Sequence, residues 1–526
     1  MIQRHLILAA LLFLTACLKL FSQDTEVFDT LVYFNEITYH SELEEEAFNE
    51  YFSEDNSSFI KLFLAKDENI TKQQYEIRLT SFLDYTKELR EDKNYNKPEK
   101  KKVKYYYNLI HNKYLEKYEM NTNFSKIFNN GYYNCVTGSI LYGLIFDELK
   151  IPYKIKLSPI HAYLITYPQT ESILVETTNP VKGYFIFNEN FKQNYVDHLL
   201  DNKLITASEY ASYSTEELFN KYYFKEEDVT LKEMVGIQYY NEAVIQFQNQ
   251  KFEEAFYELE KAYLFYPSEK IAYLLYYSAA LVIDKHDFSD IKYVDFLYKI
   301  ARYTNYGITQ EQIIGEFGRI TQNQLDYKGN YELYDAIFFK LYEKLNDEEI
   351  KNEISFIYNY EKARLFIRNE RYESAFPYIE KALQIRPDHL DLQTMFIYAL
   401  ANKMESLVLT NEKLESLVDY AEKYPALKNN NTYNDMVCDA YLYTTIQNYE
   451  EGNLSEALLY HAKLKELIKK HEHYSNYDYN ITRLYSSAAV YYFRKGNTKK
   501  AKTILLEGLK FVPDSYELKQ RLKVIN

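Results

Sequence analysis

Apolar residues recur at helical spacing along most of this chain of 526 residues. In the N-terminal segment, residues 23–100, Phe48, Phe52, Phe59 and Leu62 follow this pattern between polar positions. Such a period of three to four residues is typical of amphipathic helices. The pattern predicts a helical segment there, and this segment contains no candidate catalytic group.

The pattern changes in the middle of the chain, where a predicted helix is followed by predicted strands. Val136, Ile140 and Leu144 keep helical spacing, so a helix is expected to open at Cys135 and to end at Ile151–Pro152. Apolar runs bounded by turn residues then predict strands. The expected strands are His161–Tyr167, Ser172–Glu176 and Tyr184–Phe187, with Pro168–Glu171 as the turn between the first two.

A four-residue turn fixes the register of the first two predicted strands. If Tyr167 pairs with Ser172, the numbers of paired residues sum to 339, and His161 lies opposite Thr178. Glu176 is then a diagonal neighbour of His161 on the same face, with Cα atoms roughly 7–8 Å apart. A slip of one residue would move the two side chains to opposite faces.

Small residues recur beyond about residue 231 with one repeated spacing. Three times the intervals are 12, 7 and 5 residues, and each series ends on proline. Two antiparallel helices approach closely where side chains are small, and proline cannot continue a helix. The series are Ala243, Ala255, Ala262 and Pro267; Ala363, Ala375, Ala382 and Pro387; and Ala489, Ala501, Gly508 and Pro513.

These series resemble the tetratricopeptide repeat, a helix-turn-helix unit of 34 residues. The resemblance implies an α-helical solenoid over residues 231–526 that binds a protein partner. Less regular helical segments lie between the three series, and we expect them to form degenerate helix pairs of the same superhelix. The His471–Glu472–His473 triplet is interpreted as a solvated helix end, because two histidines at that spacing point to different sides of a helix.

The middle of the chain resembles the transglutaminase-like core, a relative of papain-like cysteine peptidases. A helix-borne Cys135 and a strand-borne His161 are followed by Glu176 in Glu-Thr-Thr, similar to the Asp-x-Thr of that family, and Leu149–Pro152 is similar to its Leu-Gly-Ile-Pro. The resemblance implies a domain over residues 101–225 in which Cys135 is the nucleophile, His161 the base and Glu176 the orienting acid. The departures from the family pattern are Glu176 for Asp, Lys150 for Gly, and the absence of Trp near His161.

Catalysis by a cysteine nucleophile requires residues of these types. A thiolate is the nucleophile, a helix N-terminus favours it, and a neighbouring imidazole can take its proton. The alternative interpretation is that Cys135 and His161 are packed residues of a catalytically idle domain. The protein would then be a non-catalytic envelope scaffold or assembly protein. We expect no metal and no cofactor in either case.

Composition and charge exclude some partners. The net charge of −15 disfavours nucleic acid, which requires a basic surface. The basic run from Lys97 to Lys104 and the acidic run from Glu42 to Glu46 are interpreted as solvated helix faces. Gly and Pro are scarce, which suits a mainly α-helical chain, and the resemblance to the transglutaminase-like core adds one α+β domain.

The N-terminus predicts export. Arg4 precedes the apolar run Leu6–Leu14, which is shorter than the ~20 residues that span a bilayer, so residues 1–22 are interpreted as a signal peptide. Cleavage after Ser22 is one expected outcome. The other is lipid attachment at Cys17, which would be the single membrane contact. The expected location is periplasmic or secreted. The remaining cysteines, Cys135 and Cys438, fall in different predicted domains, so a disulfide is not expected.

Overall fold

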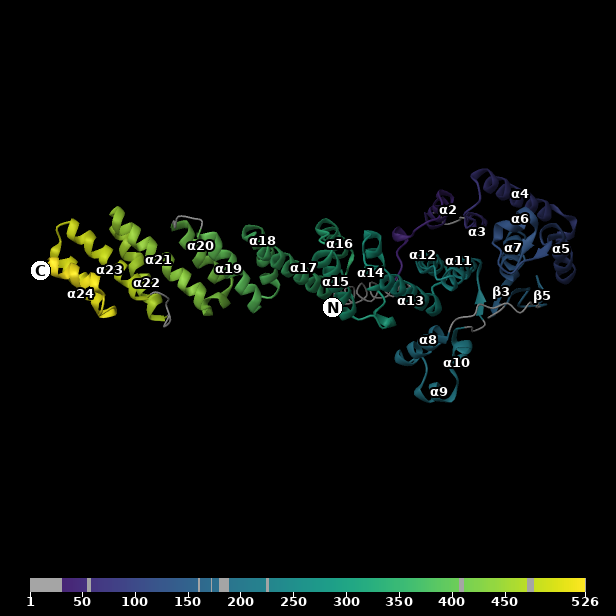
Figure 1. Cartoon of the computed structure of the whole chain (residues 1–526). Coiled ribbons are helices and arrows are strands. Elements are labelled where there is room, and N and C mark those ends of the chain that lie inside the picture. Colours follow the sequence, from purple (N-terminus) through teal and green to yellow (C-terminus); the bar gives the residue numbers. More distant parts are fainter. Residues whose placement is uncertain are drawn as a thin grey trace, which may run out of the picture. The chain divides into compact units, whose positions relative to one another are not determined.

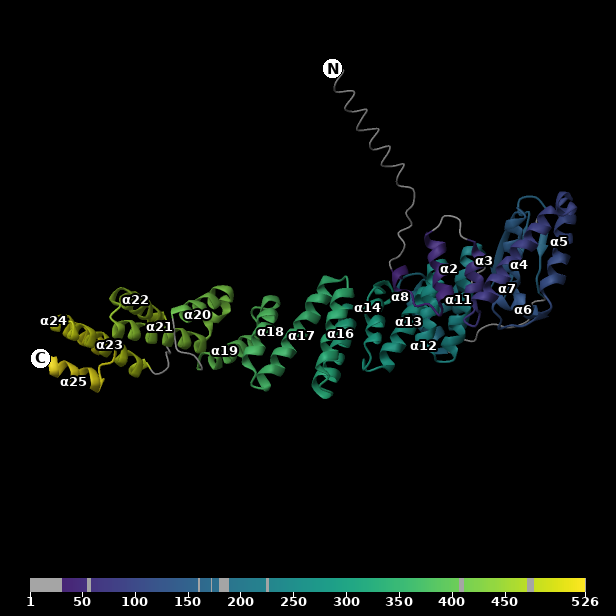
Figure 2. The same ribbon diagram turned by 90° about the horizontal axis from the view of Figure 1, so that it is seen from above.

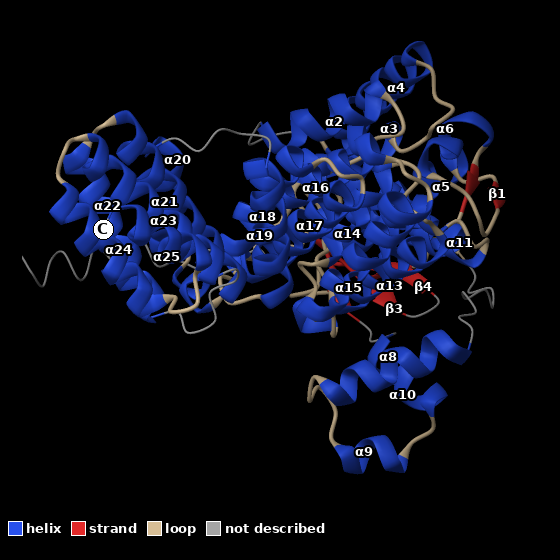
Figure 3. Ribbon diagram, turned by 60° about the vertical axis from the view of Figure 1, so that its left-hand side comes forward, coloured by secondary structure: helices blue, strands red, loops and turns tan. Residues whose placement is uncertain are grey.

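The computed structural model describes residues 31–53, 58–158, 161–171, 173–178, 189–223, 227–405, 411–470 and 477–525. The predicted signal peptide with Cys17, the predicted strand Tyr184–Phe187 and the His471–His473 triplet lie outside these residues. The fold is mainly helical with two small sheets (Figure 1, Figure 3). It divides into two compact units, a first unit up to Ile313 and a second unit from Ile314 on.

The N-terminal part of the first unit is helical, as the apolar pattern predicts. Its helices are α2 (Glu42–Ser53), α3 (Phe59–Ala65), α4 (Lys72–Glu91) and α5 (Glu99–Tyr114), with short 3-10 turns at Phe34–Glu36 and Lys93–Asn96. Figure 2 shows these N-terminal helices, with α4 and α5 beside α7 (Cys135–Glu148).

A four-stranded antiparallel sheet lies in the first unit beside a long buried helix. The strand order is β5-β4-β3-β6, from β3 (Tyr153–Ser158), β4 (His161–Thr166), β5 (Ile173–Val175) and β6 (Glu227–Val229). Helix α7 (Cys135–Glu148) packs on β3 and β4. Before it, β1 (Lys117–Tyr118) pairs in parallel with β2 (Tyr132–Tyr133), and the short η3 (Phe124–Lys126) and α6 (Ile127–Asn130) lie between them.

The register of β4 and β5 is the predicted one. Leu164 pairs with Val175 and Thr166 with Ile173, so the paired numbers sum to 339. Strand β3 is not among the predicted strands, although its sequence alternates between polar and apolar residues and its Ile155 is fully buried. The alternating residues are Lys154, Ile155, Lys156 and Leu157. This alternating segment is short and begins only a few residues after the end of α7.

Helix α7 ends at Glu148, shortly before the predicted Ile151–Pro152, and a left-handed residue follows at Lys150. Lys150 has φ of +53°, and the N–H of Ile151 donates to the carbonyl of Phe146 at 2.9 Å. This geometry favours glycine at Lys150 because a side chain is strained there. It gives a physical reason for the glycine in the Leu-Gly-Ile-Pro pattern.

The rest of the first unit is helical. The chain from β5 to β6 carries α8, α9 and α10, and the chain from β6 on forms the first helix pairs. The bounds are α8 (Glu189–Asp201), α9 (Ala207–Ser212), α10 (Thr215–Tyr223), α11 (Leu231–Gln248), α12 (Phe252–Phe265), α13 (Glu269–Lys285), η4 (Ile291–Tyr293), α14 (Val294–Ile300) and η5 (Thr304–Tyr306). Helix α15 (Gln310–Ile320) crosses the division between the units.

The second unit consists of helices in its described residues. Its bounds are η6 (Thr321–Tyr327, a π-helix), α16 (Tyr331–Lys344), α17 (Glu348–Arg368), α18 (Tyr372–Ile385), α19 (Leu390–Glu405), α20 (Asn411–Lys423), η7 (Pro425–Asn429), α21 (Asn431–Glu451), α22 (Leu454–Lys470), α23 (Tyr477–Arg494), α24 (Thr498–Phe511) and α25 (Tyr516–Ile525). Within the described chain, no helix is long and apolar enough to cross a membrane.

The three series of small residues mark three packed helix pairs: α11 with α12, α17 with α18, and α23 with α24. The eight alanines are at most 1% exposed. At Gly508, a Cβ atom would lie 2.7 Å from Cβ of Tyr485, so only glycine fits this contact. Burial at the helix–helix contact is what the spacing predicts.

The same tight turn joins the helices of each pair. Gln250, Glu370 and Gly496 have φ of +62°, +57° and +75°. In each turn the next N–H donates to a carbonyl five residues back, as from Lys251 to Gln246 at 2.9 Å. The pair α21 and α22 has the same turn at Gly452, with φ of +89°, so a degenerate pair is present there as expected.

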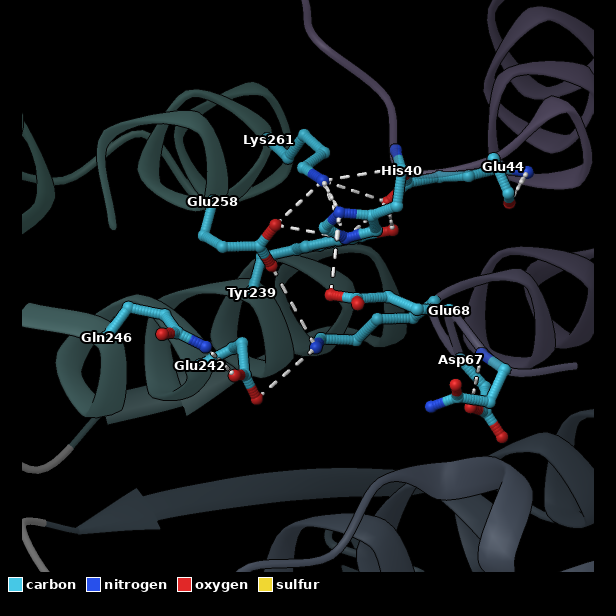
Figure 4. A network of polar contacts seen from close by, with 12 residues as sticks. His40, Glu44, Asp67, Glu68, Tyr239, Glu242, Gln246, Glu258 and Lys261 are labelled. Atoms are coloured by element: carbon cyan, nitrogen blue, oxygen red, sulfur yellow. Dashed lines mark hydrogen bonds and ion pairs between the residues drawn. The ribbon is translucent and has the colours of Figure 1, made fainter. Parts of the chain in front are cut away.

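Buried charges join the N-terminal segment to the first helix pair (Figure 4). Lys261 in α12 and Glu44 in α2 are both 0% exposed, and Nζ of Lys261 lies 3.1 Å from Oε1 of Glu44 and 2.8 Å from Oε1 of Glu258. The hydroxyl of Tyr239 donates to the same Glu44 oxygen at 2.8 Å, and His40 lies 3.0 Å from Glu258.

These contacts correct one sequence interpretation. The acidic run from Glu42 to Glu46 is not wholly solvated, because Glu44 is buried against Lys261. Burial by itself raises the pKa of Glu258, yet Lys261, His40 and Lys66 outweigh it and bring that pKa to about 2. Glu258 is therefore ionised at neutral pH and held by opposite charges.

We expect Lys261→Met to release helix α2 from the first helix pair. The substitution leaves Glu44 and Glu258 buried without their cation, which costs about 3–5 kcal/mol. Hydrogen exchange of the amides in residues 42–53 should become markedly faster. Lys251→Met, at an exposed position just before the same helix, is the matched control. Unchanged protection of α2 in Lys261→Met would contradict this role.

Candidate functional site

Cys135 is the first residue of α7, and a capping box fixes its position. Oδ1 of Asn134 accepts the N–H of Thr137 at 2.8 Å, and the N–H of Asn134 donates to Oγ1 of Thr137 at 2.9 Å. The amide of Asn134 also donates to the carbonyl of Met120 at 2.9 Å. The partly exposed thiol thus lies at the positive end of the helix dipole, which favours a thiolate.

His161 begins β4 and lies between the thiol and a carboxylate. Its side chain is hydrogen-bonded to Cys135, and its Nε2 lies 2.7 Å from Oε2 of Glu176. Because Nε2 faces Glu176, Nδ1 is the ring nitrogen left for the thiol. Tyr163, two residues along the strand, stacks on the imidazole with ring centroids 5.8 Å apart. The ring is therefore held at Nε2 and on one face.

Glu176 follows directly after β5 and is held at several points. Its Oε1 accepts the N–H of Thr178 at 3.0 Å, which leaves Oε2 for His161. Its backbone carbonyl accepts the hydroxyl of Tyr107 in α5 at 3.0 Å. Tyr107 is itself stacked on Tyr142 of α7, with ring centroids 5.5 Å apart. Helix α5 thus holds the backbone of Glu176, and Thr178 holds its carboxylate.

The surroundings keep the imidazole protonated. The hydrogen bond to Cys135 raises the pKa of His161, burial opposes this rise, and Glu176 adds to it, so that the pKa is about 9. An imidazolium between a thiol and a carboxylate stabilises the thiolate form of its sulfur partner. The arrangement can supply a nucleophile and a proton donor at neutral pH.

The three site residues named from the sequence are brought together here. Their order of contact, Cys135 to His161 to Glu176, is the one the resemblance implies. Sequence reasoning missed Asn134 and Tyr107. The Asn-x-x-Thr spacing could have predicted the first as a helix cap, whereas no local signal marks the second, because its partner is 69 residues away.

The second thiol, Cys438, has the opposite environment. It is 1% exposed in α21, and burial, together with Asp435 and Asp439, raises its pKa to about 12. A buried neutral thiol is unreactive. The two cysteines therefore differ in access and in the groups that surround them.

The described residues contain no group of three or more His, Cys, Asp or Glu side chains placed to hold a metal ion.

Comparison with known proteins finds a family match in the helical part of the chain. Residues 357–389 match a family model described as the tetratricopeptide repeat. This segment, from α17 to the end of α18, is similar to a tetratricopeptide repeat. It contains the second series of small residues, and such repeats form protein-binding helical regions. A search of curated proteins finds no match to the chain.

Iodoacetamide labelling tests the difference between the thiols. At pH 6 the full chain should be labelled at Cys135 much faster than at Cys438, because His161 is protonated and lies beside the first thiol. The advantage should shrink as the pH approaches about 12, the pKa of Cys438, because that thiol then also loses its proton. Peptide mass spectrometry measures both rates.

His161→Ala should remove the advantage of Cys135, and Glu176→Gln should reduce it, because the ring loses its orienting carboxylate. Equal rates for both thiols in the unmodified chain would contradict an activated Cys135.

Proposed function

We propose that the protein is an enzyme that hydrolyses or transfers an amide acyl group through Cys135, with a transglutaminase-like core. The observation that carries this proposal is the hydrogen-bonded series of Cys135, His161 and Glu176 at the N-terminus of α7. The antiparallel sheet beside a helix that opens with the thiol supports the family resemblance.

The chemistry follows from the position of each group. The Cys135 thiolate attacks the substrate carbonyl carbon, and a tetrahedral oxyanion forms. The N–H groups of Cys135 and Val136, which precede the capped N–H of Thr137, can donate to this oxyanion. His161 then gives its proton to the leaving amine, and a thioester remains on Cys135.

The second half-reaction regenerates the thiolate. Water or an acceptor amine attacks the thioester carbonyl, and neutral His161 removes the proton of the attacking group. The carbon–sulfur bond breaks, and the protonated imidazole again faces the thiolate. Glu176 orients the ring and stabilises its charge in both halves.

The repeats suggest how a substrate is brought to this site. Tetratricopeptide repeats commonly mediate protein–protein interaction, which supports a protein partner in general terms. We propose that the helical repeats bind a protein that is the substrate or that carries it.

The acyl-enzyme is the test of the proposed chemistry. Incubation of the full chain with p-nitrophenyl acetate should release a burst of nitrophenol and add one acetyl group to Cys135, detected by peptide mass. Cys135→Ser and His161→Ala should abolish the burst, while Cys438→Ser, which removes only the buried thiol, should retain it. Release of acetate or of an acetylated added amine separates hydrolysis from transfer. A burst that survives Cys135→Ser, or no burst at all, favours the non-catalytic scaffold.

We infer that the protein is exported. The support is Arg4 followed by the apolar run Leu6–Leu14. Intact mass of the protein purified from its own cells should correspond to a start at Gln23 or at a lipidated Cys17, and the two masses differ by the lipid and six residues. A mass that retains Met1–Ser22 would contradict export.

A further inference from the structure

Helix α7 approaches the end of β5 unusually closely at one residue. A Cβ atom added at Gly138 would lie 3.0 Å from Oγ1 of Thr177 and 3.1 Å from its Cβ. Gly138 lies one helical turn from Cys135, and Thr177 follows Glu176 directly. The contact therefore sits between the nucleophile's helix and the segment that carries the orienting acid.

Both sides of this contact are held in place. Thr177 is 1% exposed, and its neighbour Glu176 is bound through its carbonyl by Tyr107 and through its carboxylate by Thr178. On the helix side, the cap at Asn134 fixes the first turn of α7. A side chain at position 138 must therefore displace the helix or the acid-bearing segment.

Gly138 lowers the stability of α7, and its position explains why a glycine is nevertheless present. Glycine within a helix destabilises it by roughly 1 kcal/mol relative to alanine. Gly138 is buried inside α7 and has helical backbone, so no turn or positive φ requires it. The close approach to Thr177 is the feature that an alanine would lose.

We propose that Gly138 is a positioning residue for the reaction of Cys135. Because Gly138 has no side chain, α7 can lie close to Thr177. This spacing brings the thiol of Cys135 to His161, the ring that Glu176 orients. This inference rests on the proposed function and adds a residue that touches neither substrate nor reacting atoms. A shift of a few tenths of an ångström at position 138 lengthens the contact between Cys135 and His161.

Gly143 in the same helix provides a matched control. A Cβ there would lie 3.0 Å from Cδ2 of Leu231 and 3.4 Å from the ring of Tyr153, both of them side-chain atoms. It lies more than two turns from Cys135, at the other end of α7. Gly143→Ala tests an added methyl group in α7 without the contact to Thr177.

The experiment measures the rate of Cys135 alkylation by iodoacetamide from pH 6 to pH 9 in the full chain. Gly138→Ala should slow labelling at pH 6 by about tenfold, because small misplacements of reacting groups cost one to two orders of magnitude in rate. Its pH profile should move toward that of His161→Ala. Gly143→Ala should keep the profile of the unmodified protein, with circular dichroism confirming that each variant is folded.

Removal of the opposing side chain should restore the site. In Gly138→Ala with Thr177→Gly, both atoms nearest the new methyl group are absent, so labelling at pH 6 should recover most of the lost rate. A merely structural loss would not be rescued in this way. Wild-type labelling in Gly138→Ala, or no recovery in the double variant, would overturn the positioning role.

The same data separate this inference from the proposed function. If the unmodified chain labels no faster than His161→Ala, the activated thiol itself is wrong and both proposals fall. If the unmodified chain labels fast and Gly138→Ala labels equally fast, the positioning role alone is wrong.

Discussion

The first unit depends on a cation that is entirely removed from water. Lys261 has three carboxylate and imidazole neighbours, of which Glu44 and His40 come from a segment more than 200 residues earlier. A buried charge is tolerated only when its partners are in place, so the N-terminal segment and helix α12 specify each other's position. Phe48 adds apolar contact here, packing against Tyr239 and Phe265 with ring centroids 5.8 and 5.2 Å apart.

The candidate site is connected to the same helix pair by the chain itself. Strand β6 pairs with β3, and one residue later the chain enters α11. The sheet that carries His161 thus continues into the first helix pair, and α7 contacts α11. This explains why the compact first unit extends to Ile313, whereas the spacing of small residues alone placed everything from 231 on with the solenoid.

Local rules made part of the structure predictable. The helix pairs follow from the intervals between alanines, because each pair is closed by a tight turn and a short-range contact. The register that brings Glu176 near His161 follows from the length of one turn. The burial of Glu44 and the contact of Tyr107 with Glu176 were not predictable, since their partners are 217 and 69 residues away. The three side chains of the candidate site could be predicted from the sequence, but the distant residues that hold them in position could not.

The buried charges around Lys261 also constrain the order in which the first unit can form. The segment with His40 and Glu44 emerges early during synthesis, but its buried partners Glu258 and Lys261 emerge more than 200 residues later. Contacts of such high sequence separation form slowly, because a long loop must close first. Until then Glu44 lacks Lys261 and Phe48 lacks Tyr239 and Phe265, and the early chain exposes apolar surface that a chaperone can hold. Folding of the first unit is therefore expected to be completed by the docking of its N-terminal segment rather than to begin with it.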